Sequence, residues 1–185
     1  MRIVTGELRG RKFNPPPDFS ARPTTDFAKE NLFNVLENFI DFENVTALDL
    51  FSGTGSISYE FASRGCRNVV SVEQNFKHQR FIAETIRKFG ISDRVRSLKG
   101  DAFKYIANTN QQFDIIFADP PFDMPTVEAL PDAVFNSQIL KAEGLLIIEH
   151  SDAKKFASHP LREQTRCYGK VNFTFFRHTP KPNKA

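Results

Sequence analysis

The segment Asp119-Pro120-Pro121-Phe122 contains the residue types that point most directly to a reaction. Two prolines restrict the backbone and remove N–H donors, so that the carbonyl of Pro120 is free to accept a hydrogen bond from a ligand. An exocyclic amine of a base has two N–H donors, which the Asp119 carboxylate and the Pro120 carbonyl can accept. Phe122 is placed to stack on the ring that carries the amine. The alternative is a proline-rich turn that covers a core phenylalanine.

A turn with two glycines follows Asp49 at the end of an apolar run. Gly53 and Gly55 permit a tight turn and let the backbone approach a ligand closely. A dinucleotide fingerprint would have its third glycine where this chain has Ser58, and Asp49 suits a cationic ligand better than a pyrophosphate. A plain strand-to-helix turn could carry the same two glycines.

Two more acidic residues follow predicted strands. Glu73 could accept hydrogen bonds from both ribose hydroxyls of a nucleoside, or it could be an acid favoured by a helix N-terminus. Asp101 could contact an adenine amino group or cap a helix. Two acids without a phosphate-binding lysine favour S-adenosylmethionine over a dinucleotide. The predicted cofactor-binding residues are Asp49, Phe51, Gly53, Gly55, Glu73, Asp101 and Ala102.

Strand and helix patterns alternate along the chain and would bring these motifs to one edge of a sheet. Such alternation predicts an α/β fold with a mainly parallel sheet and helices on both faces, whose ligands bind at the carboxyl ends of the strands. A closing antiparallel hairpin is expected within residues 166–177. The predicted strands are 45–51, 69–73, 95–99, 113–118 and 145–149, and the predicted helices begin at 26 or span 56–64, 76–89, 101–107 and part of 127–140.

The charge is distributed unevenly between three predicted segments. Residues 1–25, with two short strands and an extended arm, carry a net charge of +3, and residues 26–149 carry −6. Residues 150–185 carry +6, and their last part, 180–185, is expected to be a disordered tail after a catalytic domain that spans 26–179. The basic ends could hold a polyanion or could merely aid solubility. The predicted phosphate-binding residues are Arg2, Arg9, Arg11, Lys12 and Arg22.

Composition narrows the class of protein. A chain of 185 residues with 40% hydrophobic residues fits one domain of ordinary size. No apolar run approaches the roughly 20 residues of a membrane span, and the N-terminus has no secretory signal pattern. Cys66 and Cys167 lack metal-ligand spacing. We therefore expect a cytoplasmic protein with no metal and no membrane association.

The chain resembles the RsmD-type 16S ribosomal RNA guanine-N2 methyltransferases, within the S-adenosylmethionine-dependent methyltransferases. The resemblance covers nearly the full length, and Arg-Pro-Thr-Thr-Asp is its most specific part. It rests on Ile3–Gly6, Arg9–Lys12, Arg22–Asp26, Lys29–Asn34, Asp49–Gly55, Asp119–Phe122 and Tyr168-Gly169.

The resemblance implies a seven-stranded Rossmann-like sheet with an N-terminal β-hairpin that helps to hold RNA. It also implies methyl transfer from S-adenosylmethionine to the N2 amine of a guanine in 16S ribosomal RNA, with Asp119, Pro120 and Phe122 at the base. We expect a monomer that acts on a small-subunit particle. The chain departs from the family pattern at Phe27 and Ala28, where more basic residues are common, and at Phe122, where tyrosine is common.

Other functions fit part of the sequence. An adenine-N6 or cytosine-N4 DNA methyltransferase uses the same motif, although this chain lacks room for the usual target-recognition region. A protein-glutamine methyltransferase fits the motif but not the basic ends. A non-catalytic RNA-binding ribosome-assembly factor would not need Asp49, Glu73 and Asp119 to be intact. A dinucleotide oxidoreductase is disfavoured by Ser58 and the Asp119–Phe122 segment.

Overall fold

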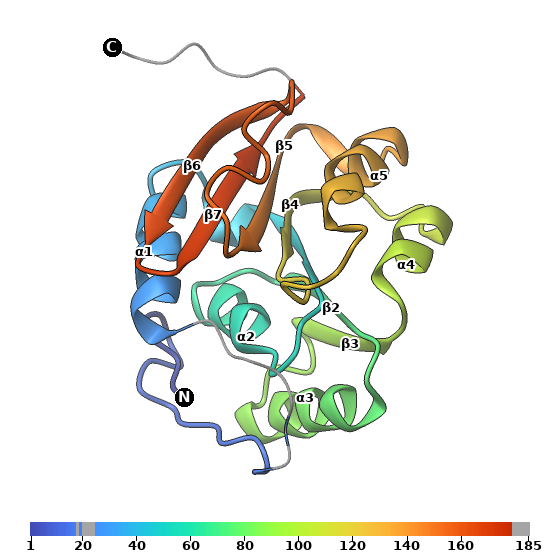
Figure 1. Ribbon diagram of the computed structural model, residues 1–185. Helices are drawn as coiled ribbons and strands as arrows, with labels where there is room; N and C mark the ends of the chain where they lie inside the picture. Colours follow the sequence, from blue (N-terminus) through green and yellow to red (C-terminus); the bar gives the residue numbers. More distant parts are fainter. Residues whose placement is uncertain (18, 20–24, 179–185) are drawn as a thin grey trace.

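The computed structural model describes residues 1–17, 19 and 25–178, which form a mixed sheet with helices on both faces (Figure 1). Within these residues the sheet has seven strands in the order β3-β2-β1-β4-β5-β7-β6. The first five in this order are parallel, and β7 runs antiparallel to both β5 and β6. The strands are β1 (Thr46–Leu50), β2 (Asn68–Glu73), β3 (Val95–Lys99), β4 (Phe113–Ala118), β5 (Leu140–His150), β6 (Arg162–Tyr168) and β7 (Val171–Phe176).

Alternating strand residues divide the apolar core between the two faces of the sheet, as the period of two in a strand requires. Ala47 packs in one cluster with residues of α1, α2 and α3, whereas Leu48 packs in the other with residues of α4 and α5. The helices are α1 (Asp26–Leu36), α2 (Ser56–Ser63), α3 (Phe76–Phe89), α4 (Ala102–Asn108) and α5 (Leu130–Asn136), with short 3-10 turns at Phe42–Asn44 and Val127–Ala129.

The predicted fold class is confirmed, with shifts at the ends of elements. The first strand stops at Leu50 because Phe51 takes a left-handed conformation, with φ of 57°. The fourth helix begins at Ala102 because Asp101 is its N-cap. The fifth strand begins at Leu140 and the closing hairpin at Arg162, both earlier than expected. The apolar pattern marked only the continuously buried part of β5, and β6, which has no buried residue, gives no such pattern at its start.

The N-terminal hairpin has less regular strand pairing than expected. In place of two short strands, one isolated antiparallel bridge joins Arg2 and Lys12. Gly6 and Gly10 between them have φ of 84° and 82°, a left-handed conformation that interrupts a regular ladder. Apolar side chains hold the segment against the core of the sheet instead. These buried residues are Ile3, Leu8 and Phe13.

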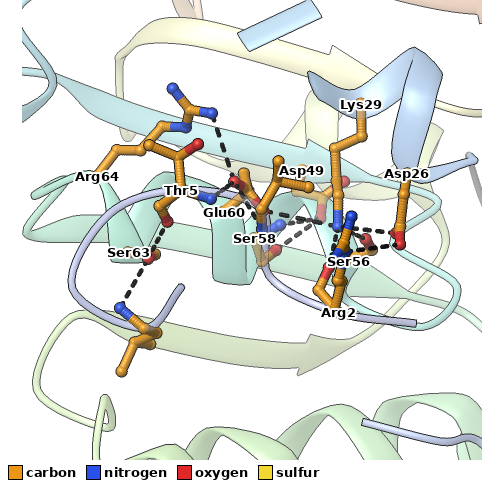
Figure 2. Close-up of polar contacts among 12 residues, drawn as sticks. Arg2, Thr5, Asp26, Lys29, Asp49, Ser56, Ser58, Glu60, Ser63 and Arg64 are labelled. Carbon is orange, nitrogen blue, oxygen red and sulfur yellow. Dashed lines mark hydrogen bonds and ion pairs between the residues drawn. The ribbon is translucent and has the colours of Figure 1, made fainter. Parts of the chain in front are cut away.

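A buried lysine fastens this hairpin to α1 and α2 (Figure 2). The Lys29 side chain has no exposed surface, and its ammonium donates hydrogen bonds to the Arg2 carbonyl at 2.6 Å and to Ser56 Oγ at 3.0 Å. Glu60 Oε2 lies 3.6 Å from Lys29 Nζ. Burial lowers the pKa of Lys29, and the charge of Glu60 opposes this effect. The ammonium therefore depends on its partners to remain charged.

Glu60 completes the attachment from the side of α2. Its carboxylate, also fully buried, accepts hydrogen bonds from the main-chain N–H groups of Val4 and Thr5, at 3.0 and 2.9 Å. Arg64, one turn further along the helix, lies 3.4 Å from the same carboxylate. The hairpin, α1 and α2 are thus joined through one set of buried charges (Figure 2).

Candidate active site

A cavity of about 850 Å³ lies at the carboxyl ends of the parallel strands. The strand order reverses between β1 and β4, since β2 follows β1 on one side and β4 lies on the other. This topological switch point is where ligands bind in open α/β sheets. The volume falls in the range of small-molecule sites. The predicted site residues that line the cavity are Asp49, Phe51, Gly53, Glu73, Ala102, Asp119, Pro120 and Phe122.

Asp49 lies at the end of β1 and is almost fully buried, with 1% of its surface exposed. The main-chain N–H and the hydroxyl of Ser58 both donate to Asp49 Oδ2, at 3.1 and 2.6 Å. Burial nevertheless raises the pKa of Asp49 to about 7. Position 58 therefore holds this carboxylate, a role that a glycine could fill only through its backbone.

The turn after β1 contains Phe51, whose backbone is strained, and Gly55, at a position where the backbone conformation requires a glycine. Phe51 lines the cavity with φ of 57°, and such a conformation of a residue other than glycine is concentrated at functional sites. Gly55 is the N-cap of α2 with φ of 77°. A Cβ atom at Gly55 would lie 2.5 Å from the hydroxyl of Tyr59. Gly55 thus shapes the turn without being one of the residues that line the cavity.

Glu73 ends β2, beside the same turn. Its Oε2 accepts a hydrogen bond from the Gly53 N–H at 2.8 Å, and its Oε1 accepts one from the Asn75 N–H, also at 2.8 Å. His78 Nδ1 lies 3.7 Å from Oε1. The carboxylate is therefore held at the cavity wall by two backbone donors, and it retains lone pairs for a ligand.

Asp101, one of the predicted cofactor-binding residues, caps a helix in the structure and does not line the cavity. Its Oδ1 accepts a hydrogen bond from the Lys104 N–H at 2.9 Å and caps α4. The cavity is lined at this point by Gly100 and Ala102. The structure therefore favours the capping interpretation that the sequence left open.

Asp119, Pro120 and Phe122 extend the cavity from the end of β4. Burial, together with the charges of Glu149 and Asp49, raises the pKa of Asp119 well above its ordinary value. Phe122 is 40% exposed, so part of its side chain remains accessible at the cavity. The structure thus brings to the cavity all three residues that the sequence predicted would bind an amine on a flat ring.

Glu149, a residue that was not among the predicted site residues, is 3% exposed and lines the same cavity from the end of β5. The rule that identified the other acids, an acidic side chain at the carboxyl end of a parallel strand, would have found it too. Thr25, Tyr168 and Lys170 also line the cavity and were missed. They come from the start of α1 and from the β6–β7 hairpin, whose positions depend on tertiary packing.

The predicted phosphate-binding residues differ in the contacts that they make within the protein. Arg9 and Lys12 are exposed on the hairpin. Arg2 lies 3.4 Å from Asp26, and Arg11 donates to the Phe89 carbonyl at 3.4 Å and lies over the Phe89 ring. Arg22, and the expected tail at 180–185, lie outside the described residues.

Neither a metal site nor a membrane span is found in the part of the chain that the structure describes. In residues 1–17, 19 and 25–178, no three His, Cys, Asp or Glu side chains are grouped as a metal site requires. No helix among these residues is long and apolar enough to cross a membrane.

Comparisons with known proteins agree with this architecture. The chain is 28% identical over 149 residues to "Ribosomal RNA small subunit methyltransferase D" of Escherichia coli K12, which covers 80% of this chain and 74% of that protein. The solved structure of yhhF of Escherichia coli, provisionally described as a methyltransferase, has a TM-score of 0.81 and 23% identity and covers 95% of this chain and 96% of that chain. Hypothetical protein TTHA0928 of Thermus thermophilus has a TM-score of 0.77 and 29% identity and covers 96% of this chain and 99% of that chain.

The family described as "Conserved hypothetical protein 95" matches residues 1–177, which is nearly the whole chain. The relatives named above and the arrangement of carboxylates around the cavity agree with that match. The chain therefore belongs to this family and is a methyltransferase of the RsmD type.

Proposed function

We propose that the protein transfers a methyl group from S-adenosylmethionine to the exocyclic N2 amine of a guanine in 16S ribosomal RNA. The observation that carries the proposal is that Asp119, Pro120 and Phe122 line the same cavity as Asp49 and Glu73. One group of residues suits an amine on a flat ring and the other suits a nucleoside. The name of the Escherichia coli relative, a small-subunit ribosomal RNA methyltransferase, supports the choice of RNA.

The residues around the turn after β1 fit S-adenosylmethionine. Glu73 is held by two backbone N–H groups and faces the cavity, where its free lone pairs can accept hydrogen bonds from ribose hydroxyls. The Asp49 carboxyl, with its pKa raised to about 7 by burial, gains its charge more readily beside a cation. When bound, S-adenosylmethionine supplies a methyl group that its sulfonium sulfur has already activated. Phe51, Gly53 and Ala102 would form the rest of that part of the cavity.

Asp119, Pro120 and Phe122 would prepare the base. The lone pair of the guanine N2 amine is delocalised into the ring, so the amine must be held and polarised before it can react. Asp119 and the Pro120 carbonyl would accept its two N–H bonds and stabilise the positive charge that develops on nitrogen. Phe122 would stack on the base, which must leave its own stack at a cost of a few kcal/mol.

The carboxyl group of Asp119 is also placed to take up a proton. Its raised pKa, caused by burial and the neighbouring acids, makes it a better base once it has ionised. Release of the amine proton to Asp119 is therefore part of the proposal.

The basic hairpin would hold the RNA. We assign this role to residues 1–25, with Arg9 and Lys12 exposed for phosphate contacts, and catalysis to residues 26–179. Arg2 and Arg11 would contribute beside their contacts within the protein, and Arg22 is included on the sequence alone. We further propose that the enzyme is a cytoplasmic monomer. We also propose that its substrate is an assembled particle, because a short hairpin offers little surface for recognition of RNA by itself.

Methyl transfer from radiolabelled S-adenosylmethionine tests the proposal. The substrates are small ribosomal subunits that lack the modification, naked 16S RNA and duplex DNA, and boiled enzyme is the control. Labelling of particles above naked RNA is the expected result. Labelling of DNA alone would contradict the assignment of RNA as the substrate. Cofactor binding with no labelling of any substrate would favour the non-catalytic assembly factor.

A further inference from the structure

Asp119 and Glu149 are placed together by the register of two parallel strands. Ala118, the last residue of β4, is paired with Ile148 of β5, so the residues that follow them, Asp119 and Glu149, are carried to the same edge of the sheet. Both line the cavity. The charge of Glu149 is also the largest charge effect on Asp119, which agrees with their closeness.

Asp119 and Glu149 thus bring two carboxyl groups to a cavity that Pro120, with its main-chain carbonyl, and Phe122 also line. All three polar groups accept hydrogen bonds when the carboxylates are ionised. A ligand that binds well in this part of the cavity must therefore present hydrogen-bond donors along most of one edge of its ring. The negative charges of two neighbouring carboxylates favour a ligand that brings several N–H groups.

We propose that Glu149 is a specificity-determining residue that selects guanine by accepting a hydrogen bond from its ring N1–H. The inference rests on the proposed function and deepens it, because Asp119 and Pro120 account for the amine but not for the identity of the base. In this arrangement Glu149 accepts from N1–H while Asp119 and Pro120 accept from the two N–H bonds of N2.

The hydrogen-bonding edges of the bases explain the selection. Guanine presents the N1–H and the N2 amine side by side, so its edge consists of donors. Adenine and cytosine each present an amine beside a ring nitrogen that carries a lone pair, at N1 and N3 respectively. A carboxylate at the position of Glu149 would face that lone pair and repel it. A site with buried groups made for a substrate N–H rejects analogues that lack it far more strongly than an apolar pocket could.

The base 2-aminopurine separates this role from amine binding. It keeps the N2 amine of guanine but has a lone pair at N1 in place of the N–H. The test uses RNA with guanine or 2-aminopurine at the mapped target position, prepared by ligation and assembled into particles where particles are the substrate. The measurement is kcat/KM for methyl transfer by the wild-type enzyme and by Glu149→Gln. Glu143→Gln, which changes an exposed acid on the same strand, is the matched control.

Wild-type enzyme should prefer guanine to 2-aminopurine by about 100-fold or more, because the lost hydrogen bond involves a charged, buried acceptor. The Glu149→Gln amide can donate to the N1 lone pair, so this variant should lose about 10- to 100-fold on guanine and should bring the preference close to one. Cofactor affinity should stay within about twofold in both variants. The control variant should keep the wild-type preference.

Equal use of the two bases by wild-type enzyme would overturn the inference, and so would a Glu149→Gln variant that retains the full preference for guanine. Equal use by wild-type enzyme is decisive even if the variant does not fold, whereas loss of the preference in Glu149→Gln is needed to assign the selection to Glu149, because 2-aminopurine also lacks O6 of guanine. These results differ from failure of the proposed function, in which wild-type enzyme would methylate no guanine in small-subunit RNA at all.

Discussion

The ammonium of Lys29 donates a hydrogen bond to the main-chain carbonyl of Arg2 at 2.6 Å and another to the hydroxyl of Ser56 at 3.0 Å. Arg2 belongs to the basic hairpin, whereas Ser56 lines the cavity at the start of α2. One buried side chain therefore fixes the hairpin relative to the cavity wall. Since Glu60 lies 3.6 Å from the same ammonium, the charge of Lys29 is compensated inside the protein.

Replacement of Lys29 by methionine should lower the free energy of unfolding by about 1–3 kcal/mol, because the Arg2 carbonyl and the Ser56 hydroxyl lose their buried donor and Glu60 keeps only Arg64 as a partner charge. The double variant Lys29→Met with Glu60→Gln should recover part of this loss, and denaturant unfolding of all four proteins in the cycle measures the coupling. If the two single changes were simply additive, the charges would not form a pair.

Gly55→Ala should destabilise the fold more than Gly90→Ala does. Both glycines have positive φ, 77° and 70°, so a side chain at either costs about 1–2 kcal/mol. A Cβ at Gly55 would also lie 2.5 Å from the Tyr59 hydroxyl, whereas no atom lies within 4 Å of one at Gly90. This overpacking should add about 1–3 kcal/mol in thermal or denaturant unfolding. Equal losses for both variants would show that Tyr59 moves aside freely.

The order of strands and helices along the chain and most of the cavity residues could be predicted from the sequence. Both predictions use short stretches of sequence: the periodicity of apolar residues, and the rule that ligands bind at the carboxyl ends of parallel strands. Asp49, Glu73 and Asp119 could be assigned to one edge on that basis, and all three line the cavity. For Asp101 the local sequence fitted both a contact with an adenine amine and a helix cap. Only the position at which α4 begins shows that it is the cap.

Other features depend on contacts between distant parts of the chain and have no local pattern. Lys29 has the sequence context of an ordinary charge on α1, and its burial follows only from the position of the hairpin over α2. Tyr168 and Lys170 reach the cavity because β7 pairs with β5 and carries the β6–β7 turn back over the sheet edge. Such positions require the assembled fold.

Asp49 should make the stability of the protein depend on pH. Burial raises its pKa from 3.8 to about 7, so the folded protein binds a proton more tightly than the unfolded chain. The resulting stabilisation is fully present below about pH 4 and is lost as the pH rises through about 7. In denaturant unfolding across this window, the stability difference between wild type and Asp49→Asn should therefore change steadily. A constant difference would mean that Asp49 is ionised throughout.

The basic hairpin should control RNA affinity but not cofactor affinity. Changing Arg9 and Lys12 together to alanine should weaken RNA binding and reduce the slope of log affinity against log salt by about two. Arg80→Ala with Lys104→Ala removes two exposed cations of α3 and α4 and serves as the control. Filter binding at several salt concentrations measures both pairs. Identical slopes for the two double variants would contradict the role of the hairpin.

Asp119→Ala should reduce methyl transfer by about 100- to 1000-fold or more, because the amine loses an acceptor that holds it and stabilises its developing charge. Its affinity for S-adenosylmethionine should remain nearly unchanged, since Asp49 and Glu73 are intact. Single-turnover transfer and calorimetric titration of the cofactor measure the two effects separately. Loss of both to the same extent would contradict the division between base-binding and cofactor-binding residues.

The most direct test of the central claim is to identify the nucleoside that receives the methyl group. Small subunits that lack the modification would be treated with the enzyme and deuterium-labelled S-adenosylmethionine, and the RNA would be digested and analysed by mass spectrometry against synthetic standards. We expect the label in N2-methylguanosine, since the acceptors of Asp119 and Pro120 call for an exocyclic amine and Glu149 would select guanine among the bases that carry one. Label on a ring nitrogen, a carbon or a ribose hydroxyl would contradict the account, because none of these atoms is an exocyclic amine.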